Sequence, residues 1–267
     1  MQRSPLAIRP LTTEQAQTLA DTLPDSSQTV ISISQLKRGL AQAYVVGDVA
    51  DWETAVIFDS GQPGEPMAFG RNAAQIADLM AALPGWFCVN VVDDVASQLG
   101  PLLAAKMGCP VRFYGDIYHT LTQPAPRWPH PAVRRLTTAD LPLLQAAPEM
   151  IRGHDPARML GEMSAAGAIV DGRIVAIAQN YALSDRYGDV GVSTLPDFRG
   201  QGLATAAAAL VAQGLQGNAC TERSRSGRIP VWSCGVDNHA SLRVAQKLGF
   251  QFESRRTYII LEQETAQ

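Results

Sequence analysis

The sequence is short of the features that mark nucleic-acid-binding, membrane and secreted proteins. Only 18% of its 267 residues are charged and the formal net charge is -3, so no basic face is available for nucleic acid or an anionic membrane. No run of about 18 apolar residues occurs, and the first residues lack a continuous apolar segment of signal-peptide length. We therefore expect a cytoplasmic protein whose partner is a small molecule rather than nucleic acid or a membrane.

Cysteine pairs and metal-binding clusters are also missing. The four cysteines form no C-x-x-C pair, and the four histidines do not cluster at zinc-ligand spacing. The cysteines are Cys88, Cys109, Cys220 and Cys234. We expect reduced thiols and no metal site. Cys234 as a covalent nucleophile, with His239 as its base, is less favoured than a packing cysteine.

What the sequence does contain is an internal repeat. Residues 8–15 and 133–140 each read as an apolar strand, then Leu-Thr-Thr, then a helix start with a capping signal. Residues 104–108 and 245–249 each end a helix in glycine, and a β-rich segment follows. Matching openings and closings in the same order predict a tandem duplication.

A proline-rich segment separates the two halves. Residues 122–131 contain four prolines in ten positions, which forbids helix and favours an extended linker. We therefore predict domains at 1–121 and 132–267, each an α/β fold with a mixed sheet and helices on its faces. In the second half the expected strands are 168–170, 173–181, 189–194, 229–234 and 251–261, and the expected helices are 139–147, 202–216 and 239–248.

The most informative stretch is LPDFRGQGLATAAAAL at residues 195–210, in which two glycines precede an alanine-rich helix. A dinucleotide-binding loop needs a third glycine or an alanine where Thr205 stands, and a P-loop needs Gly-Lys-Ser/Thr. A cradle for pyrophosphate remains, in which unsatisfied N–H groups at a helix N-terminus converge on an anion. A plain tight turn between strand and helix is the competing interpretation.

A pyrophosphate site would explain why each residue type occurs in this segment. Arg199 would add a positive charge, while Gly200 and Gly202 would let the backbone approach the phosphates. Ala204 is small where the helix packs closely, and the alanines after it form helix readily.

These residues resemble the GNAT superfamily of acyl-CoA N-acyltransferases. The segment 199–204, RGQGLA, fits the family pattern R/Q-x-x-G-x-G/A, where the loop binds the pyrophosphate of coenzyme A. The strands 189–194 and 229–234, and the segment NHASLRVAQKLGF at 238–250, occur in the family's order. The resemblance covers about residues 132–262, and the tandem arrangement resembles the zwittermicin-resistance-type acetyltransferases.

The resemblance implies a site for acetyl-CoA in residues 132–267. Strand 189–194 would splay from strand 229–234 to hold the pantetheine arm. The residues implied in coenzyme binding are Val192, Ser193, Thr194, Arg199, Gly200, Gln201, Gly202, Leu203, Ala204, Thr205, Asn238 and Ser241. Asn238 is equally suited to cap the helix that follows it.

The first half resembles a degenerate copy of the same fold. Its counterpart of the glycine loop lies near residues 68–75, which contain one glycine and no R-x-x-G-x-G/A. We expect this half to have lost coenzyme binding.

The chemistry implied is direct attack of an acceptor amine on the thioester, which requires a base, an oxyanion site and an acid. The family's tyrosine acid falls at Ala245 here, which puts the acid in doubt. Glu149, His154 and Asp155 are weak candidates for the base, since a solvated surface is the simpler interpretation.

We therefore expect an N-acetyltransferase that acts on a primary amine of a small molecule and that could form a homodimer. The alternative is a non-catalytic sensor or interaction protein that binds acyl-CoA. Residues 218–228, which are rich in Arg and Ser, are expected to be a solvated and mobile surface insertion.

Overall fold

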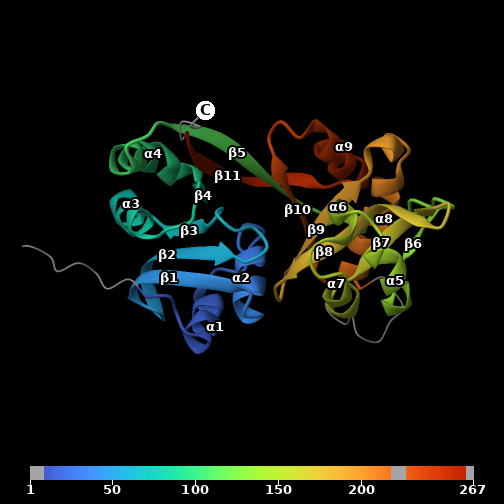
Figure 1. Ribbon diagram of the computed structural model, residues 1–267, viewed down its shortest axis with the longest axis horizontal. Coiled ribbons are helices and arrows are strands. Elements are labelled where there is room, and N and C mark those ends of the chain that lie inside the picture. The colour runs from blue at the N-terminus through green and yellow to red at the C-terminus, as the bar shows by residue number, and fades with distance from the viewer. Residues whose placement is uncertain (1–8, 218–226, 263–267) are drawn as a thin grey trace, which may run out of the picture. The chain divides into compact units, whose positions relative to one another are not determined.

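The computed structural model describes residues 9–217 and 227–262, and the chain forms two compact units (Figure 1). The first unit contains the chain up to Pro24, then Ser32–Asp116, and the chain from Arg255 onwards. The second unit contains Asp25–Ile31 and Ile117–Ser254. The predicted insertion at 218–228 lies almost wholly outside the described residues.

The first unit is a mixed sheet with helices on both faces. Its strands are β1 (Ala41–Asp48), β2 (Asp51–Asp59), β3 (Met67–Gly70), β4 (Cys88–Val92), most of β5 (Val111–Thr120) and most of β11 (Gln251–Leu261). They lie in the order β1-β2-β3-β4-β11-β5. The helices are α1 (Thr13–Thr22), most of α2 (Val30–Lys37), α3 (Ala73–Ala82) and α4 (Asp93–Met107).

Two hydrophobic clusters hold these helices to opposite faces of the first unit's sheet. Figure 1 shows α1 and α2 on one side of the strands and α3 and α4 on the other. Leu19 and Leu36 belong to the cluster on the first face, and Met80 and Leu99 to the cluster on the second. Burial of these side chains removes apolar area from water and is the main force that holds the layers together.

The second unit repeats this plan. Its strands lie in the order β10-β9-β8-β7-β6, and the end of β5 lies beside β10. The strands are β6 (Val133–Arg135), β7 (Ala165–Val170), β8 (Arg173–Leu183), β9 (Tyr187–Thr194) and β10 (Ile229–Gly235). The helices are α5 (Leu141–Gln145), α6 (Glu149–Arg152), α7 (Pro156–Glu162), α8 (Leu203–Leu215) and α9 (His239–Leu248), with 3-10 turns at Thr138–Asp140 and Pro196–Phe198.

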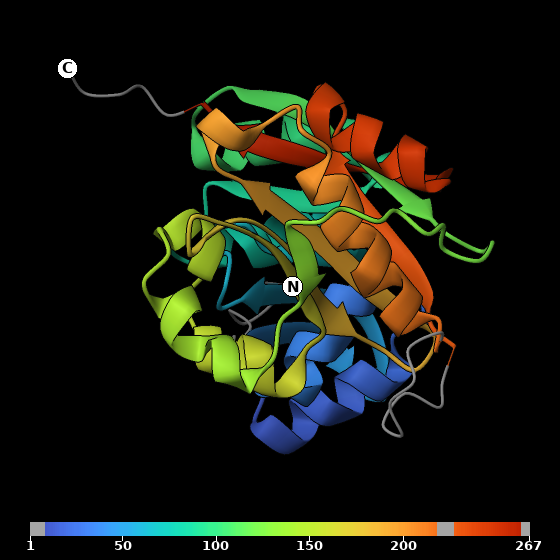
Figure 2. The same ribbon diagram turned by 90° about the vertical axis from the view of Figure 1, so that its right-hand side faces the viewer.

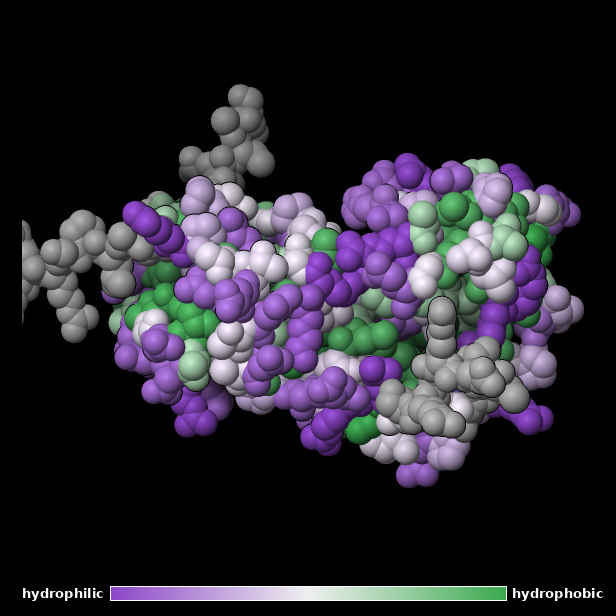
Figure 3. Space-filling view, turned by 90° about the horizontal axis from the view of Figure 1, so that it is seen from below, coloured by the Kyte–Doolittle hydropathy of each residue, from purple (hydrophilic) through white to green (hydrophobic). Residues whose placement is uncertain are grey.

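Helix α8 lies across the sheet of the second unit, as the view onto that unit shows (Figure 2). Its alanines at 206–209 are each at most 1% exposed, and Ala207, Ala208 and Ala209 belong to a hydrophobic cluster that includes small strand residues such as Ala166 and Ala178. Small side chains on both partners let the helix approach the sheet closely. Figure 3 shows hydrophilic and intermediate colours over much of one face of the molecule, with hydrophobic patches among them.

The predicted fold class is confirmed, since both units are mixed α/β structures of the same plan. Their openings match in detail: the N–H of Leu11 donates to the carbonyl of Ala43, and the N–H of Leu136 donates to that of Ala165, both at 2.9 Å. The predicted helix over 139–147 is shorter than expected, with a 3-10 turn before α5, and Pro142 stands in the first turn of α5.

The sequence predicts one domain over residues 132–267, but the structure assigns the end of the chain to the first unit. From Arg255 onwards the chain belongs to the first unit, because Arg256–Ile260 of β11 pair antiparallel with Cys88–Val92 of β4. The three described cysteines are free thiols. No helix within residues 9–217 and 227–262 is long and apolar enough to cross a membrane, and these residues contain no group of three or more metal-ligating side chains.

The close packing of α8 on the sheet predicts that enlargement of Ala208 destabilises the protein. Ala208 is fully buried, so Ala208→Leu should lower the free energy of unfolding by about 1–3 kcal/mol through overpacking. Chemical denaturation measures this change. Ala240→Leu, at an exposed position of α9, is the control and should change the free energy of unfolding by less than about 0.5 kcal/mol. Equal effects of the two substitutions would contradict the packing argument.

Candidate functional site

The candidate site begins where two parallel strands of the second unit separate. Strands β9 and β10 pair at Tyr187–Ile229, Gly188–Pro230 and Asp189–Val231, and the pairing ends there. On its other side β9 continues to pair with β8 as far as Thr194. The last five residues of β9 are therefore held by β8 alone, as the predicted splay requires.

The alternation of hydrogen bonds between β8 and β9 shows which backbone groups of β9 face the gap between β9 and β10. The N–H of Leu195 donates to the carbonyl of Val175 at 2.9 Å, which makes this pair a hydrogen-bonded pair of the β8–β9 ladder. Hydrogen-bonded and non-hydrogen-bonded pairs alternate along an antiparallel ladder, so Ser193 also bonds to β8. Val192 and Thr194 therefore direct their backbone groups away from β8. The Thr194 carbonyl accepts a long hydrogen bond of 3.4 Å from Nε of Arg199.

The loop after β9 depends on its glycines for backbone conformation. Gly200 has φ +78° and Gly202 has φ +81°, which residues with a side chain rarely adopt. A Cβ at either position would meet no atom within 4 Å, so packing does not require glycine here. Arg199, Gly200 and Gln201 are exposed. The loop is thus a bent, open segment that presents its backbone to solvent.

Helix α8 begins with its first N–H groups unsatisfied by the helix. Gly202 is the N-cap and supplies no side-chain hydrogen bond, and the first helical bond runs from the N–H of Ala206 to the Gly202 carbonyl at 3.0 Å. The amides of Leu203, Ala204 and Thr205 precede it and lack such a partner. The side chains of Leu203 and Thr205 are buried, which fixes the helix end that carries these donors. Such an end favours an anion.

Helix α9 places the other two residues predicted to bind coenzyme. The Oδ1 of Asn238 accepts from the N–H of Ser241 at 3.1 Å, so Asn238 is the N-cap of α9. The Ser241 hydroxyl accepts from Nε1 of the buried Trp232 at 2.9 Å. Both side chains therefore have structural roles in α9, and their contact with a coenzyme stays a prediction.

The three candidates for the catalytic base lie on the surface of the second unit. The His154 ring is 79% exposed and its Nδ1 lies 3.8 Å from Oε1 of Glu149, which is itself 70% exposed. Asp155 caps α7 and accepts from the N–H of Arg158 at 3.0 Å. Ala245, at the position of the family's tyrosine, is fully buried in the core. The arrangement assigns neither a base nor an acid.

In the first unit the corresponding strand separation contains an arginine side chain. Strands β3 and β4 make one parallel pair, Met67–Asn90. The guanidinium of Arg256, which is 1% exposed, donates through Nη2 to the carbonyls of Ala68 and Asn90, both at 2.9 Å. Its carbon Cζ lies 4.8 Å from the ring centre of Phe69. The side chain thus connects the two strands directly beyond their last pair.

The position of Ala68 corresponds to that of Val192 in the second unit. Ala43 and Ala165 are equivalent, because each accepts the matching hydrogen bond at the start of its unit. In the first unit the strand pairing leads from Ala43 through Ile57 to Met67. In the second unit it leads from Ala165 through Gln179 to Gly191. Met67 and Gly191 are therefore equivalent, and so are the residues that follow them, Ala68 and Val192. Arg256 bonds to the carbonyl whose counterpart in the second unit faces the separation of β9 and β10.

A buried polar network compensates the charge of Arg256. The Asn90 side chain accepts from Nε of Arg256 through Oδ1 and donates through Nδ2 to Asp116 at 3.2 Å. Burial, with the nearby charge of Asp116 as a further cause, raises the pKa of Tyr258 above its usual range, so this phenol stays neutral. Sequence reasoning missed the network, since Arg256 stands beside the exposed Arg255 and differs from it only in the face of β11 that it occupies.

The first unit also lacks the open helix start. Between β3 and α3 there are only two residues, and the second of them, Asn72, accepts from the N–H of Gln75 at 3.2 Å. An asparagine side chain thus satisfies a donor that is uncapped in α8. In the first unit, therefore, Arg256 bonds to the backbone at the strand separation and Asn72 caps the helix start, so this unit differs from the second at both parts of the candidate site.

A comparison with protein families gives one match. Residues 165–260 match the family GNAT acetyltransferase. A comparison with curated protein sequences finds no match. The family match shows a GNAT acetyltransferase domain over residues 165–260, within the segment that the sequence predicted, and supports an acyltransferase activity in general.

Solved structures show the same fold over most of the chain. A Drosophila protein has a TM-score of 0.67 at 16% identity, covering 95% of this chain and 98% of its own. A GCN5-related N-acetyltransferase-like protein from Streptococcus suis has a TM-score of 0.64 at 17% identity, covering 93% and 99%. A tandem GNAT protein from the clavulanic acid biosynthesis pathway has a TM-score of 0.56 at 14% identity, covering 94% and 97%.

The buried guanidinium predicts a large difference between two adjacent arginines. Arg256→Met keeps the volume but leaves the carbonyls of Ala68 and Asn90 without this donor, so the free energy of unfolding should fall by about 2–4 kcal/mol. Arg255→Met removes an ion pair with Asp93 that is about half exposed, and should cost less than about 1 kcal/mol. Urea denaturation of both variants measures the difference, and equal midpoints would contradict it.

Proposed function

We propose that the protein transfers an acetyl group from acetyl-CoA to a primary amine of a small molecule, and that the second unit does so. The observation that carries the proposal is the uncapped start of α8, preceded by two glycines with positive φ, at the point where β9 leaves β10. Because the helix dipole and free N–H groups favour anions there, a pyrophosphate is the group that the segment suits best.

The proposed contacts follow from the backbone directions. The pyrophosphate would accept hydrogen bonds from backbone amides of residues 200–205, with the exposed Arg199 as a neighbouring charge. The amides of the pantetheine arm would pair with the backbone of Val192 and Thr194, which faces away from β8. Asn238 and Ser241, at the start of α9, would approach the coenzyme from the side of β10.

In the proposed reaction the nitrogen of a neutral amine attacks the thioester carbonyl carbon. The carbon–sulfur bond then breaks, the nitrogen loses its proton to water or to a base, and the sulfur leaves as a thiolate that takes up a proton. With Ala245 at the position of the family's acid, the thiolate would leave without a dedicated donor, which its pKa of about 8.5 permits. Glu149, His154 and Asp155 remain proposals for the base.

A non-catalytic acyl-CoA sensor is the second candidate function, and the buried Ala245 is the observation that favours it. The two candidates differ in turnover. Release of free coenzyme A from acetyl-CoA in the presence of a panel of small amines, followed with a thiol reagent, is expected of the enzyme. Saturable binding of acetyl-CoA without release across a panel of small aliphatic, aromatic and sugar amines would favour the sensor.

The coenzyme site predicts a specific effect of a substitution at Gly202. Valine at φ +81° would force the backbone out of its conformation and turn the amides of the loop, so Gly202→Val should weaken binding of acetyl-CoA at least about tenfold, through loss of one or two charge-assisted hydrogen bonds of about 1.5–3 kcal/mol each. Isothermal titration calorimetry measures the affinity.

Gly172→Val is the matched control for this experiment. Gly172 also has positive φ, +70°, and open space around its Cβ position, but it lies in the turn between β7 and β8. Its replacement carries the same conformational strain and should leave the affinity for acetyl-CoA within about twofold of wild type. Equal loss of affinity in both variants would show that strain alone, rather than the loop, determines binding.

A further inference from the structure

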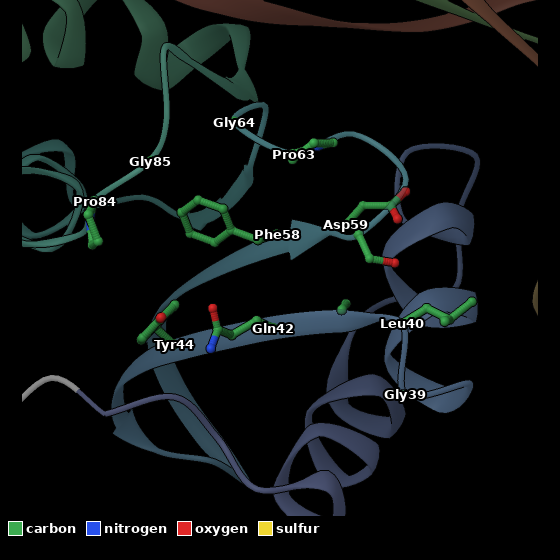
Figure 4. A pocket seen from close by; sticks show the side chains of 12 residues that line it. Gly39, Leu40, Gln42, Tyr44, Phe58, Asp59, Pro63, Gly64, Pro84 and Gly85 are labelled. Atoms are coloured by element: carbon green, nitrogen blue, oxygen red, sulfur yellow. The ribbon is translucent and has the colours of Figure 1, made fainter. Parts of the chain in front are cut away.

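A pocket of about 530 Å³ opens in the first unit, beside the end of α3 (Figure 4). Its volume lies within the range of small-molecule sites. Every residue that lines it belongs to the first unit, so the pocket shares no residue with the proposed coenzyme site.

The pocket has an aromatic floor, and two loops form its walls. The side chains of Gln42 and Tyr44 from β1 and Phe58 from β2 lie around the same space, and the rings of Tyr44 and Phe58 meet edge to face with centroids 6.0 Å apart (Figure 4). The loops at 63–64 and 84–85, each a proline followed by a glycine, form the walls. The N–H of Phe87 donates to the Gly64 carbonyl at 3.0 Å and joins the two loops.

The second unit shows what would otherwise cover this floor. The equivalent registers of the two sheets place Gln42, Tyr44 and Phe58 at the positions of Ser164, Ala166 and Asn180. In the second unit these three positions form a closed surface: the Asn180 side chain accepts from the N–H of Ser164, and Ala166 is fully buried.

The two units differ here in the length of the helix that packs over these positions. Helix α8 has 13 residues, and a Cβ on Gly214, in its last turn, would lie 3.6 Å from the hydroxyl of Ser164. Helix α3 has 10 residues and ends at Ala82, so it does not extend over Gln42. The floor that its shorter length leaves open carries two aromatic rings and an amide where the second unit has small or polar residues.

The charge of the lining restricts the ligand. None of the described lining residues is Lys or Arg, and the only acidic one, Asp59, has a carboxylate that accepts from the N–H of Gly61 at 2.8 Å and from Nε2 of Gln35 at 3.3 Å. An anion would find no positive partner there, whereas Gln42 offers a donor and an acceptor at the edge of the aromatic floor. A flat ring would stack against Tyr44 or Phe58.

We propose that this pocket is a second ligand site, which binds a small planar aromatic molecule that is neutral or positively charged. The ligand lies on Tyr44 and Phe58, in the space that the last turn of α8 fills in the second unit, and its polar edge meets the amide of Gln42. The proposal does not depend on the acetyl-transfer reaction or on the coenzyme site.

Three indoles that differ in charge test the proposal on the full-length protein by ligand-observed NMR titration. Indole and tryptamine should bind with a dissociation constant of about 1 mM or tighter, in keeping with the efficiency of small ligands. Indole-3-acetate should bind at least tenfold more weakly, because no basic side chain receives its carboxylate. Absence of indole and tryptamine binding up to about 5 mM would overturn the proposal, as would preference for the anion.

A pocket-filling variant locates the binding. Gln42 is an exposed strand residue, so Gln42→Trp should fold normally, occupy the floor and weaken binding of indole and tryptamine at least tenfold. Gln251→Trp, at an exposed position of β11, is the matched control and should bind both as wild type does. Circular dichroism checks the fold of each variant. Unchanged binding to a folded Gln42→Trp would place the ligand elsewhere and overturn the proposal.

Discussion

The parting of β9 from β10 after the Asp189–Val231 pair is the constraint on which the second unit's site depends. While two parallel strands stay paired, their backbone groups satisfy each other, and nothing else can bind along that edge. Once they part, the backbone of Val192 and Thr194 is directed toward the space that opens. The strand then passes through a glycine loop into α8, whose first amides also lack partners. In the function proposed above, these two sets of backbone groups would bind the pantetheine arm and the pyrophosphate of acetyl-CoA.

The first unit meets the same constraint with its own side chains. Its strands β3 and β4 also part, but Arg256 supplies donors to the carbonyls that this leaves free, and Asn72 caps the helix that follows. A buried guanidinium is costly unless its hydrogen bonds are made, and Asn90 and Asp116 complete the network. The two units therefore share one architecture and differ at the strand separation, where a buried arginine bonds to the backbone in the first unit.

The sequence predicts those features that depend on neighbouring residues. The glycine loop could be found because positive φ demands Gly200 and Gly202, and the repeat could be found because capping residues and glycine helix ends recur in order. Arg256 could not be identified, because its partner Ala68 lies 188 positions away and the adjacent Arg255 has the same side chain. The pocket depends on helix length, and helix ends are read from sequence only to within a few residues.

We propose that the second unit binds acetyl-CoA and that the first unit does not. Native mass spectrometry of the chain with acetyl-CoA, combined with hydrogen–deuterium exchange, tests it most directly. We expect one acetyl-CoA per chain, with slower exchange of backbone amides at 192–205 and unchanged exchange at 68–75. Two molecules per chain, or slower exchange at 68–75 alone, would contradict it.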